Sequence, residues 1–112
     1  MSTYVFVYRA PRGFTPGDPD AMSAWTSWFR GISDHVVELG NPVFTRRQIG
    51  EAPSDTELGG YSLISAANLE EAVGLTEGCP VLEGGGAIEV GELTELPPEA
   101  TAGIRTVAGS AV

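Results

Sequence analysis

The chain has 112 residues and a mass of 11.7 kDa, which is room for one domain with a modest hydrophobic core. Hydrophobic residues make up 42% and charged residues 19%, so the composition is that of a folded domain and excludes a disordered chain. All six basic residues are arginines, and they stand against 15 acidic residues for a net charge of −9. This sign excludes a nucleic-acid clamp, and the lack of lysine excludes Schiff-base chemistry.

The chain has one cysteine, Cys79, and one histidine, His35. A single cysteine forms no internal disulfide, and the two residues together are too few for a zinc site. We therefore expect no metal and no cofactor. Residues 1–9 lack a secretory signal pattern, and no stretch approaches the roughly 20 apolar residues of a membrane span. These features predict a cytoplasmic protein that is soluble and does not bind membranes.

The first predicted element is a strand over residues 3–8, where β-branched and aromatic residues occupy both alternating faces. A loop rich in proline and glycine follows at residues 11–19. A helix is then predicted over residues 20–39, because apolar residues recur at intervals of three and four. This stripe, the strongest periodic signal in the chain, consists of Met22, Trp25, Phe29, Ile32, Val36 and Leu39.

The second half predicts three more strands and one helix. Residues 43–49 read as an exposed strand near a sheet edge, and residues 60–65 as a third strand. Asn68 is a helix N-cap, with Glu71 three residues on, and this helix ends at Gly78 and Pro80. Residues 84–86 form a glycine turn before a fourth strand over residues 87–93. Residues 104–107 are the one further candidate strand.

The resulting order, β-α-β-β-α-β, predicts an α+β, ferredoxin-like fold, in which a four-stranded antiparallel sheet carries both helices on one face. The domain spans residues 1–96, and residues 97–112 form a C-terminal extension. No helix covers the second face of the sheet, which still carries apolar side chains. We therefore expect a homodimer formed through this open face, in a dimeric α/β-barrel-like association.

His35 is the first candidate for acid/base work, because its ordinary pKa lies near neutrality. The predicted helix places it on a flank of the apolar stripe, beside Trp28, while Asp34 points away, so the two form no catalytic dyad. Two alternatives remain for His35, a partly exposed packing residue or a residue facing a ligand pocket. Cys79 is predicted to be a buried structural residue at the C-terminal end of a helix, where the negative end of the dipole disfavours a reactive thiolate.

A ligand site is predicted between the first helix and the sheet. Its candidate aromatic residues also fit a plain hydrophobic core, and these are Trp25, Trp28, Tyr4, Tyr8 and Tyr61. Arg46 and Arg47 alternate across the predicted edge strand, so one of them could hold a carboxylate in a cleft. The alternative for this pair is that both are solubilising edge residues.

Several short phrases resemble the YCII-related family, in the branch that includes the DGPF-type proteins. The similarity spans about residues 3–93, in the phrases Gly40-Asn41-Pro42, Gly60-Tyr61-Ser62-Leu63-Ile64, Asn68-Leu69-Glu70-Glu71-Ala72, Gly78-Cys79-Pro80 and Gly85-Gly86-Ala87-Ile88-Glu89-Val90. The resemblance implies a small ferredoxin-like protein that dimerises through its sheets. It also implies that some relatives use a His and an Asp as an acid/base pair, and that one branch eliminates chloride from a muconolactone-type substrate.

The residues of that pair are replaced in this chain. The family's histidine position falls on Ala24, Trp25 or Thr26, and its aspartate position falls on Cys79. The Asp-Gly-Pro-Phe phrase is absent, and residues 51–55 occupy its region. The first hypothesis is therefore a dimeric YCII-like protein that binds a small molecule or acts as an interaction module. The alternative is a cofactorless isomerase or lyase acting on a small acidic or lactone-type substrate, with His35 moving a proton.

Overall fold

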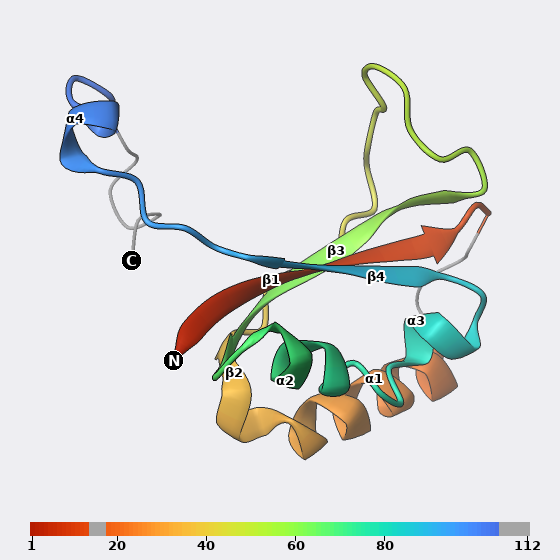
Figure 1. The fold of residues 1–112 in the computed structure, drawn as a ribbon. Helices are drawn as coiled ribbons and strands as arrows, with labels where there is room; N and C mark the ends of the chain where they lie inside the picture. The colour runs from red at the N-terminus through yellow and green to blue at the C-terminus, as the bar shows by residue number, and fades with distance from the viewer. Residues whose placement is uncertain (14–17, 106–112) are drawn as a thin grey trace.

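The computed structural model describes residues 1–13 and 18–105. A four-stranded antiparallel sheet has the strand order β2-β3-β1-β4, with all helices that pack on the sheet lying on one face (Figure 1). This arrangement confirms the predicted ferredoxin-like α+β fold. The elements are β1 (Ser2–Pro11), α1 (Pro19–Gly31), a 3₁₀ turn (Ser33–His35), β2 (Val36–Glu38), β3 (Thr56–Ala66), α2 (Leu69–Gly74), α3 (Pro80–Glu83), β4 (Ala87–Glu92) and α4 (Pro98–Thr101).

The centre of the sheet is β1, which pairs with β3 on one side and β4 on the other. Its alternation decides which residues enter the core, because Tyr4, Phe6 and Tyr8 are buried while the residues between them are partly exposed. From α1, Trp28 is buried and its ring stacks on Phe6 at a centroid distance of 6.5 Å. The predicted central strand is thus confirmed, and the core lies between it and the helices.

The predicted helix over residues 20–39 is wrong in its second half. Helix α1 ends at Gly31, the chain makes one 3₁₀ turn, and Val36 enters β2 opposite Ile64 of β3. Val36 keeps its apolar contact with the core from a strand instead of a helix. Glycine weakens the helix at residue 31, and β-branched side chains favour extended backbone, so pairing with β3 prevails over the helical spacing.

The strand predicted over residues 43–49 is also wrong. In the described chain these residues belong to the long connection between β2 and β3, and only Pro42 forms an isolated bridge, with Gly60. The guanidinium of Arg46 donates to the carbonyl oxygens of Val43 and Leu58, at 2.9 and 2.7 Å. The bond to Val43 folds the connection on itself, and the bond to Leu58 ties it to β3. The guanidinium thus holds residues 43–46 as a loop beside the sheet instead of a strand within it.

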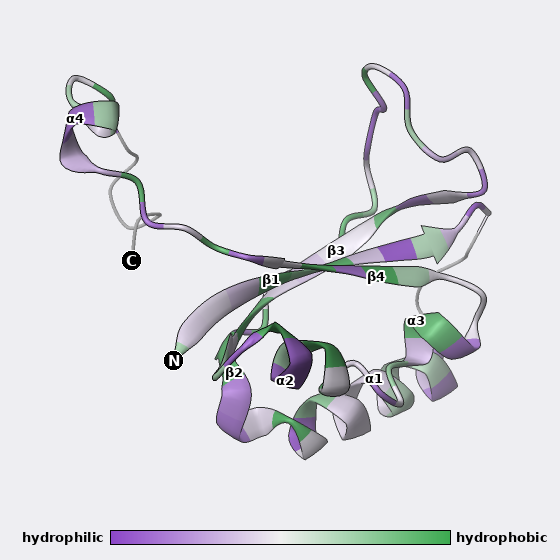
Figure 2. Cartoon of the chain, viewed as in Figure 1, coloured by the Kyte–Doolittle hydropathy of each residue, from purple (hydrophilic) through white to green (hydrophobic). Residues whose placement is uncertain are grey.

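The second half of the chain follows the prediction more closely. Strand β3 is longer than residues 60–65, and β4 matches the fourth predicted strand. Figure 2 shows the hydrophobic residues of β4 interrupted by hydrophilic ones, as expected for a strand with one buried face. Asn68 caps α2 by accepting from the Glu71 amide, and the Glu71 carboxylate accepts from the Ala67 amide, each at 2.8 Å. The helix ends at Gly74, earlier than predicted, and α3 is separate from it.

The segment after β4 leaves the sheet (Figure 1). Its last backbone bond to the sheet is donated by the Leu93 amide to the Thr3 carbonyl, at 2.8 Å. The short helix α4 follows, which the sequence did not predict. Of the candidate strand at residues 104–107, the first two residues have no strand structure and the last two lie outside the described residues. Within the described ranges, no helix has the length and apolar character needed to cross a membrane.

Candidate functional site

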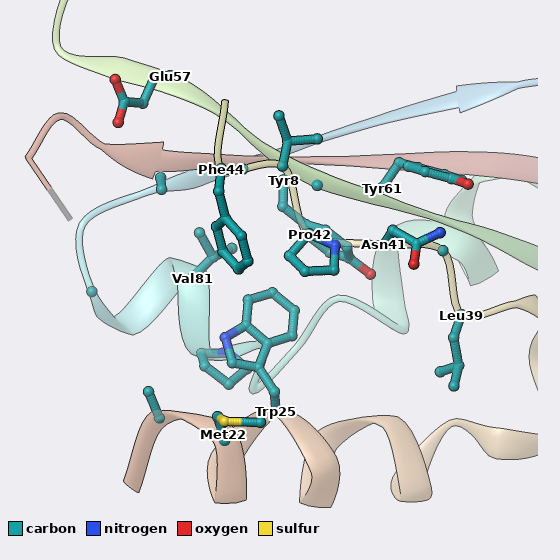
Figure 3. A pocket seen from close by; sticks show the side chains of 18 of the residues that line it. Tyr8, Met22, Trp25, Leu39, Asn41, Pro42, Phe44, Glu57, Tyr61 and Val81 are labelled. Atoms are coloured by element: carbon teal, nitrogen blue, oxygen red, sulfur yellow. The ribbon is translucent and has the colours of Figure 1, made fainter. Parts of the chain in front are cut away.

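A cavity of about 730 Å³ lies between α1, the inner face of the sheet and the chain that follows β2 (Figure 3). From α1 it receives Met22, Trp25 and Phe29, which are three and four residues apart and therefore share one side of the helix. Tyr8 of β1 and Val81 of α3 complete this apolar surface. The volume falls in the range of about 300 to 1,000 Å³ typical of small-molecule sites.

Aromatic rings meet edge to face at the centre of this surface. The ring of Tyr8 lies 4.9 Å from that of Trp25 with an interplanar angle of 79°. An edge-to-face pair of this kind is stabilised because the positive edge of one ring faces the negative face of the other. The ring of Phe29 packs on Trp25 from the other direction, tilted by 33° at a centroid distance of 5.8 Å. The apolar side of the cavity is therefore built from mutually fixed rings.

The opposite side of the cavity is residues 39–44, which lie directly on β3 with two glycines at the contact. Gly40 has φ +76°, and a Cβ there would come within 1.8 Å of the Tyr61 carbonyl oxygen. Gly60 has φ +155°, and a Cβ there would meet the Asn41 carbonyl oxygen at 2.9 Å. Only glycine allows the two backbones to approach this closely. These contacts place Pro42 and Phe44 over the cavity (Figure 3).

A buried hydrogen-bond chain ties this segment to the sheet. The Tyr8 hydroxyl donates to Ser62 Oγ at 2.9 Å, and Ser62 Oγ donates to the Leu39 carbonyl at 2.6 Å. Burial raises the pKa of Tyr8 well above its ordinary value of 10, so this phenol stays protonated at neutral pH. Tyr8 thus serves as a fixed donor to Ser62 and offers no base to the cavity.

Among the described residues that line the cavity, only Arg46 and Glu57 are charged, and both lie at its edge. Arg46 Nη1 and Glu57 Oε2 form an ion pair of 2.9 Å, and both side chains are less than one third exposed. Because the carboxylate is already paired, the cavity interior remains apolar, and a neutral molecule fits it better than an ion.

The structure distributes the predicted site residues over several places. Trp25, Tyr8, Tyr61 and Arg46 line the cavity. Tyr4 and Trp28 belong to the buried core and do not line it. Among the residues that line it, sequence reasoning missed Phe29, Met22 and Val81 as site residues, together with the wall at residues 39–44 and Glu57. The helical stripe already contained Met22 and Phe29, whereas no local signal marked the wall.

The remaining candidates lie elsewhere. His35 is in the 3₁₀ turn after α1, and its Nδ1 lies 2.9 Å from the Ser65 carbonyl oxygen, away from the cavity lining. Arg47 lines a second, smaller recess. Cys79 is fully buried, which confirms a structural cysteine. It precedes α3 as its N-cap residue, so the predicted position at the C-terminal end of a helix is wrong.

Comparison with known proteins supports the fold. No family model matches the chain, and no curated protein matches its sequence. Among solved structures, the chain is similar to the 5-chloro-2-hydroxyhydroquinone dehydrochlorinase TftG from Burkholderia phenoliruptrix, in complex with 2,5-dihydroxybenzoquinone. The match has a TM-score of 0.53 and 20% sequence identity, and it covers 81% of this chain and 93% of the other. At this identity, the likeness establishes a shared fold.

Proposed function

We propose that this protein is a YCII-related binding protein that holds a small, uncharged aromatic molecule in the cavity beneath residues 39–44. The observation that carries the proposal is the lining itself, because aromatic and aliphatic side chains from four elements converge there and the ion pair lies at the edge. The short phrases of the sequence and the likeness to the fold of a dehydrochlorinase with a bound quinone support the same assignment. Rings of this kind favour a flat ligand that can stack on them.

Titration calorimetry with 2-naphthol, a neutral aromatic probe, tests this proposal. We expect saturable binding to the wild type and at least tenfold weaker binding to Trp25→Ala, since the variant removes the ring at the centre of the cavity. Met22→Glu places a charge on an exposed lining residue without disturbing the core, and it should weaken binding as well. Leu69→Ala, in α2 and outside the lining, is the matched control. Wild-type affinity in both cavity variants, or no binding to the wild type, would overturn the proposal.

The second candidate function is a cofactorless isomerase or lyase, with His35 moving a proton and Arg46 or Arg47 holding an acidic substrate. The likeness to the fold of a dehydrochlorinase favours it. The geometry favours it less, because His35 does not line the cavity and Arg46 is paired with Glu57. A small acid that stabilises the wild type but not His35→Ala in thermal unfolding would support this candidate over the first.

We also propose that two copies associate through the open face of the sheet. On that face Val5 pairs with Leu63, and both side chains are only partly buried although no helix covers them (Figure 1). Burying such a surface against a second copy removes apolar area from water. Light scattering at micromolar concentration should give twice the chain mass of 11.7 kDa, and Leu63→Arg should halve it. A single 11.7 kDa species for the wild type would contradict the dimer.

A further inference from the structure

A second recess, of about 260 Å³, lies where the end of β1 meets the start of β3. Four of the six arginines in the chain line it, although the chain as a whole carries a net charge of −9. They are Arg9, Arg12, Arg46 and Arg47. The recess shares only Arg46 and Glu57 with the apolar cavity. It therefore forms a separate site, and an argument about it does not depend on the function proposed above.

The pairing of β1 with β3 brings these arginines together from two distant stretches of sequence. Arg9 stands opposite Leu58 in the register, and the Arg12 amide donates to the Asp55 carbonyl at 3.1 Å. The connection that leads into β3 contributes Arg46, whose Nε donates to the Leu58 carbonyl. The backbone bonds of β1 and the side-chain bond of Arg46 thus hold these residues beside one another, so the fold itself creates the basic cluster.

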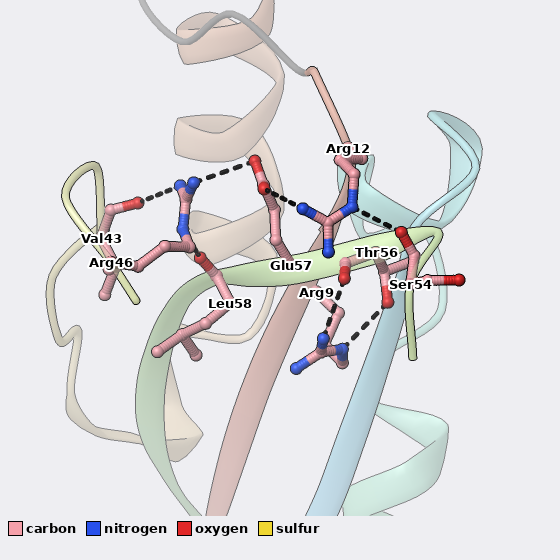
Figure 4. Close-up of polar contacts among 8 residues, drawn as sticks. All are labelled: Arg9, Arg12, Val43, Arg46, Ser54, Thr56, Glu57 and Leu58. Carbon is pink, nitrogen blue, oxygen red and sulfur yellow. Dashed lines mark hydrogen bonds and ion pairs between the residues drawn. The ribbon is translucent and has the colours of Figure 1, made fainter. Parts of the chain in front are cut away.

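The cluster carries more positive charge than its protein partners neutralise. Among the described residues that line the recess, Glu57 is the one carboxylate, and it contacts Arg46 at 2.9 Å and Arg12 at 3.7 Å (Figure 4). In the part of the chain that the structure describes, the Arg9 side chain donates to Thr56 alone, to its hydroxyl and its carbonyl oxygen, at 3.0 Å each. Within the described ranges, Arg47 takes part in no ion pair.

Four guanidinium groups against one carboxylate leave an excess of three positive charges in a small volume. Each guanidinium carries five N–H donors, of which the bonds above use only a few, so the recess offers many unused donors. Like charges held close together repel one another, and a bound anion removes that repulsion. The remainder of the chain is strongly acidic, so the attraction for an anion comes from the local excess of positive charge at the recess.

We propose that this recess binds a doubly charged oxyanion, namely a phosphate group, either as the free ion or as a monoester. Two negative charges match the local excess more closely than a single carboxylate does. Planar guanidinium groups also pair with phosphate oxygens through two parallel hydrogen bonds, which gives both strength and orientation. Arg9 and Arg47 provide the direct contacts, because neither is occupied by Glu57. Arg12 and Arg46, held by Glu57, complete the positive surroundings.

The first test is thermal unfolding in inorganic phosphate, with ionic strength held constant by sodium chloride in a buffer free of phosphate. We expect a saturable rise in the Tm of the wild type. Arg47→Gln should reduce the apparent affinity at least tenfold, and it should fold normally because no ion pair is lost. Arg9→Gln should have a similar effect. Arg30→Gln, which removes an equal charge at the end of α1 outside the recess, should keep the wild-type response.

A second titration distinguishes free phosphate from a phosphate monoester as the ligand. Phenyl phosphate is titrated under the same conditions, and binding that needs Arg47 identifies a monoester as an accepted ligand. Binding of inorganic phosphate alone, with the same dependence, identifies the free ion. Phosphate also stabilises proteins by exclusion from their surfaces, an effect that does not saturate and does not depend on one arginine. A non-saturating rise shared by Arg47→Gln, or no rise beyond that in chloride, would overturn the proposal.

Discussion

Gly40→Ala is expected to destabilise the protein by about 3 to 5 kcal/mol, which places it among the most damaging single substitutions. Gly40 has φ +76°, a backbone conformation that alanine adopts only with strain. A Cβ would also lie 1.8 Å from the Tyr61 carbonyl oxygen and 2.7 Å from its carbon. Both atoms belong to the backbone of β3, so no side-chain rotation relieves the clash. The substitution therefore forces residues 39–44 away from the sheet.

Urea unfolding followed by tryptophan fluorescence measures this loss. Gly31→Ala is the matched control, because a Cβ at Gly31 meets nothing within 4 Å and its φ is not positive. Helix propensity favours alanine over glycine by up to about 1 kcal/mol, so this variant should equal or exceed the wild type in stability. Any Gly40→Ala protein that folds should bind 2-naphthol more weakly, since its cavity wall is displaced. An unfolding midpoint equal to that of the wild type would refute the close approach of the two backbones.

The second large effect is a loss of stability at alkaline pH caused by Cys79. Burial raises the pKa of this thiol from an ordinary value near 9 to about 11. Below pH 9 the thiol is protonated in both the folded and the unfolded chain, and its contribution is fully present. Between pH 9 and 11 only the unfolded chain releases the proton, so folding loses stability as pH rises. Two pKa units correspond to about 2 to 3 kcal/mol.

Comparison with Cys79→Ala isolates this contribution. The free energy of unfolding is measured by urea titration at intervals from pH 8 to 10, below the range in which the buried tyrosines contribute most. Alanine leaves a small void in the core and lowers stability at every pH, so the slope with pH is compared rather than the absolute value. The wild-type curve should fall steeply above pH 9, and the variant curve should be nearly flat. Equal slopes would show that Cys79 is accessible to water in the folded protein.

Local patterns were sufficient for the parts of the fold in which each segment carries its own signal. Strand β1 is apolar on both faces, and Asn68 followed by Glu71 marks the start of α2. The glycines at residues 84–86 likewise mark the start of β4. The order of these elements then allows few topologies, because β-α-β crossovers are right-handed and short connections join neighbours. The ferredoxin-like arrangement was therefore predicted correctly, although its second strand was assigned to residues 43–49 instead of Val36–Glu38.

The same patterns failed where a distant contact decides the structure. Ile32, Val36 and Leu39 fit the helical spacing, yet Val36 pairs with Ile64 nearly thirty residues away. The residues around Arg46 have some strand propensity, but the bonds of its guanidinium to backbone carbonyls hold a loop. Propensity reports only the local chain, and long-range pairing overrides it here.

The candidate site was predictable on one side only. Trp25 lies on the cavity side of α1, and the periodicity of the helix was enough to indicate it. The other side depends on the close approach of Gly40 to Tyr61, whereas the sequence shows only a glycine two residues before Pro42. The second recess was not predicted, because Arg9 of β1 and Arg47 of the connection before β3 are far apart in the sequence and line one recess only in the folded chain.

The central position of β1 has a consequence for how the chain acquires its structure during synthesis. This strand leaves the ribosome before either of its partners, and its apolar residues remain without neighbours until residues 56–66 and 87–92 have been made. Sheets assembled from such distant segments form more slowly than helical bundles. An unpaired apolar strand is also prone to join other chains. The interval before β4 emerges is thus when the apolar residues of β1 are most open to contact with other chains.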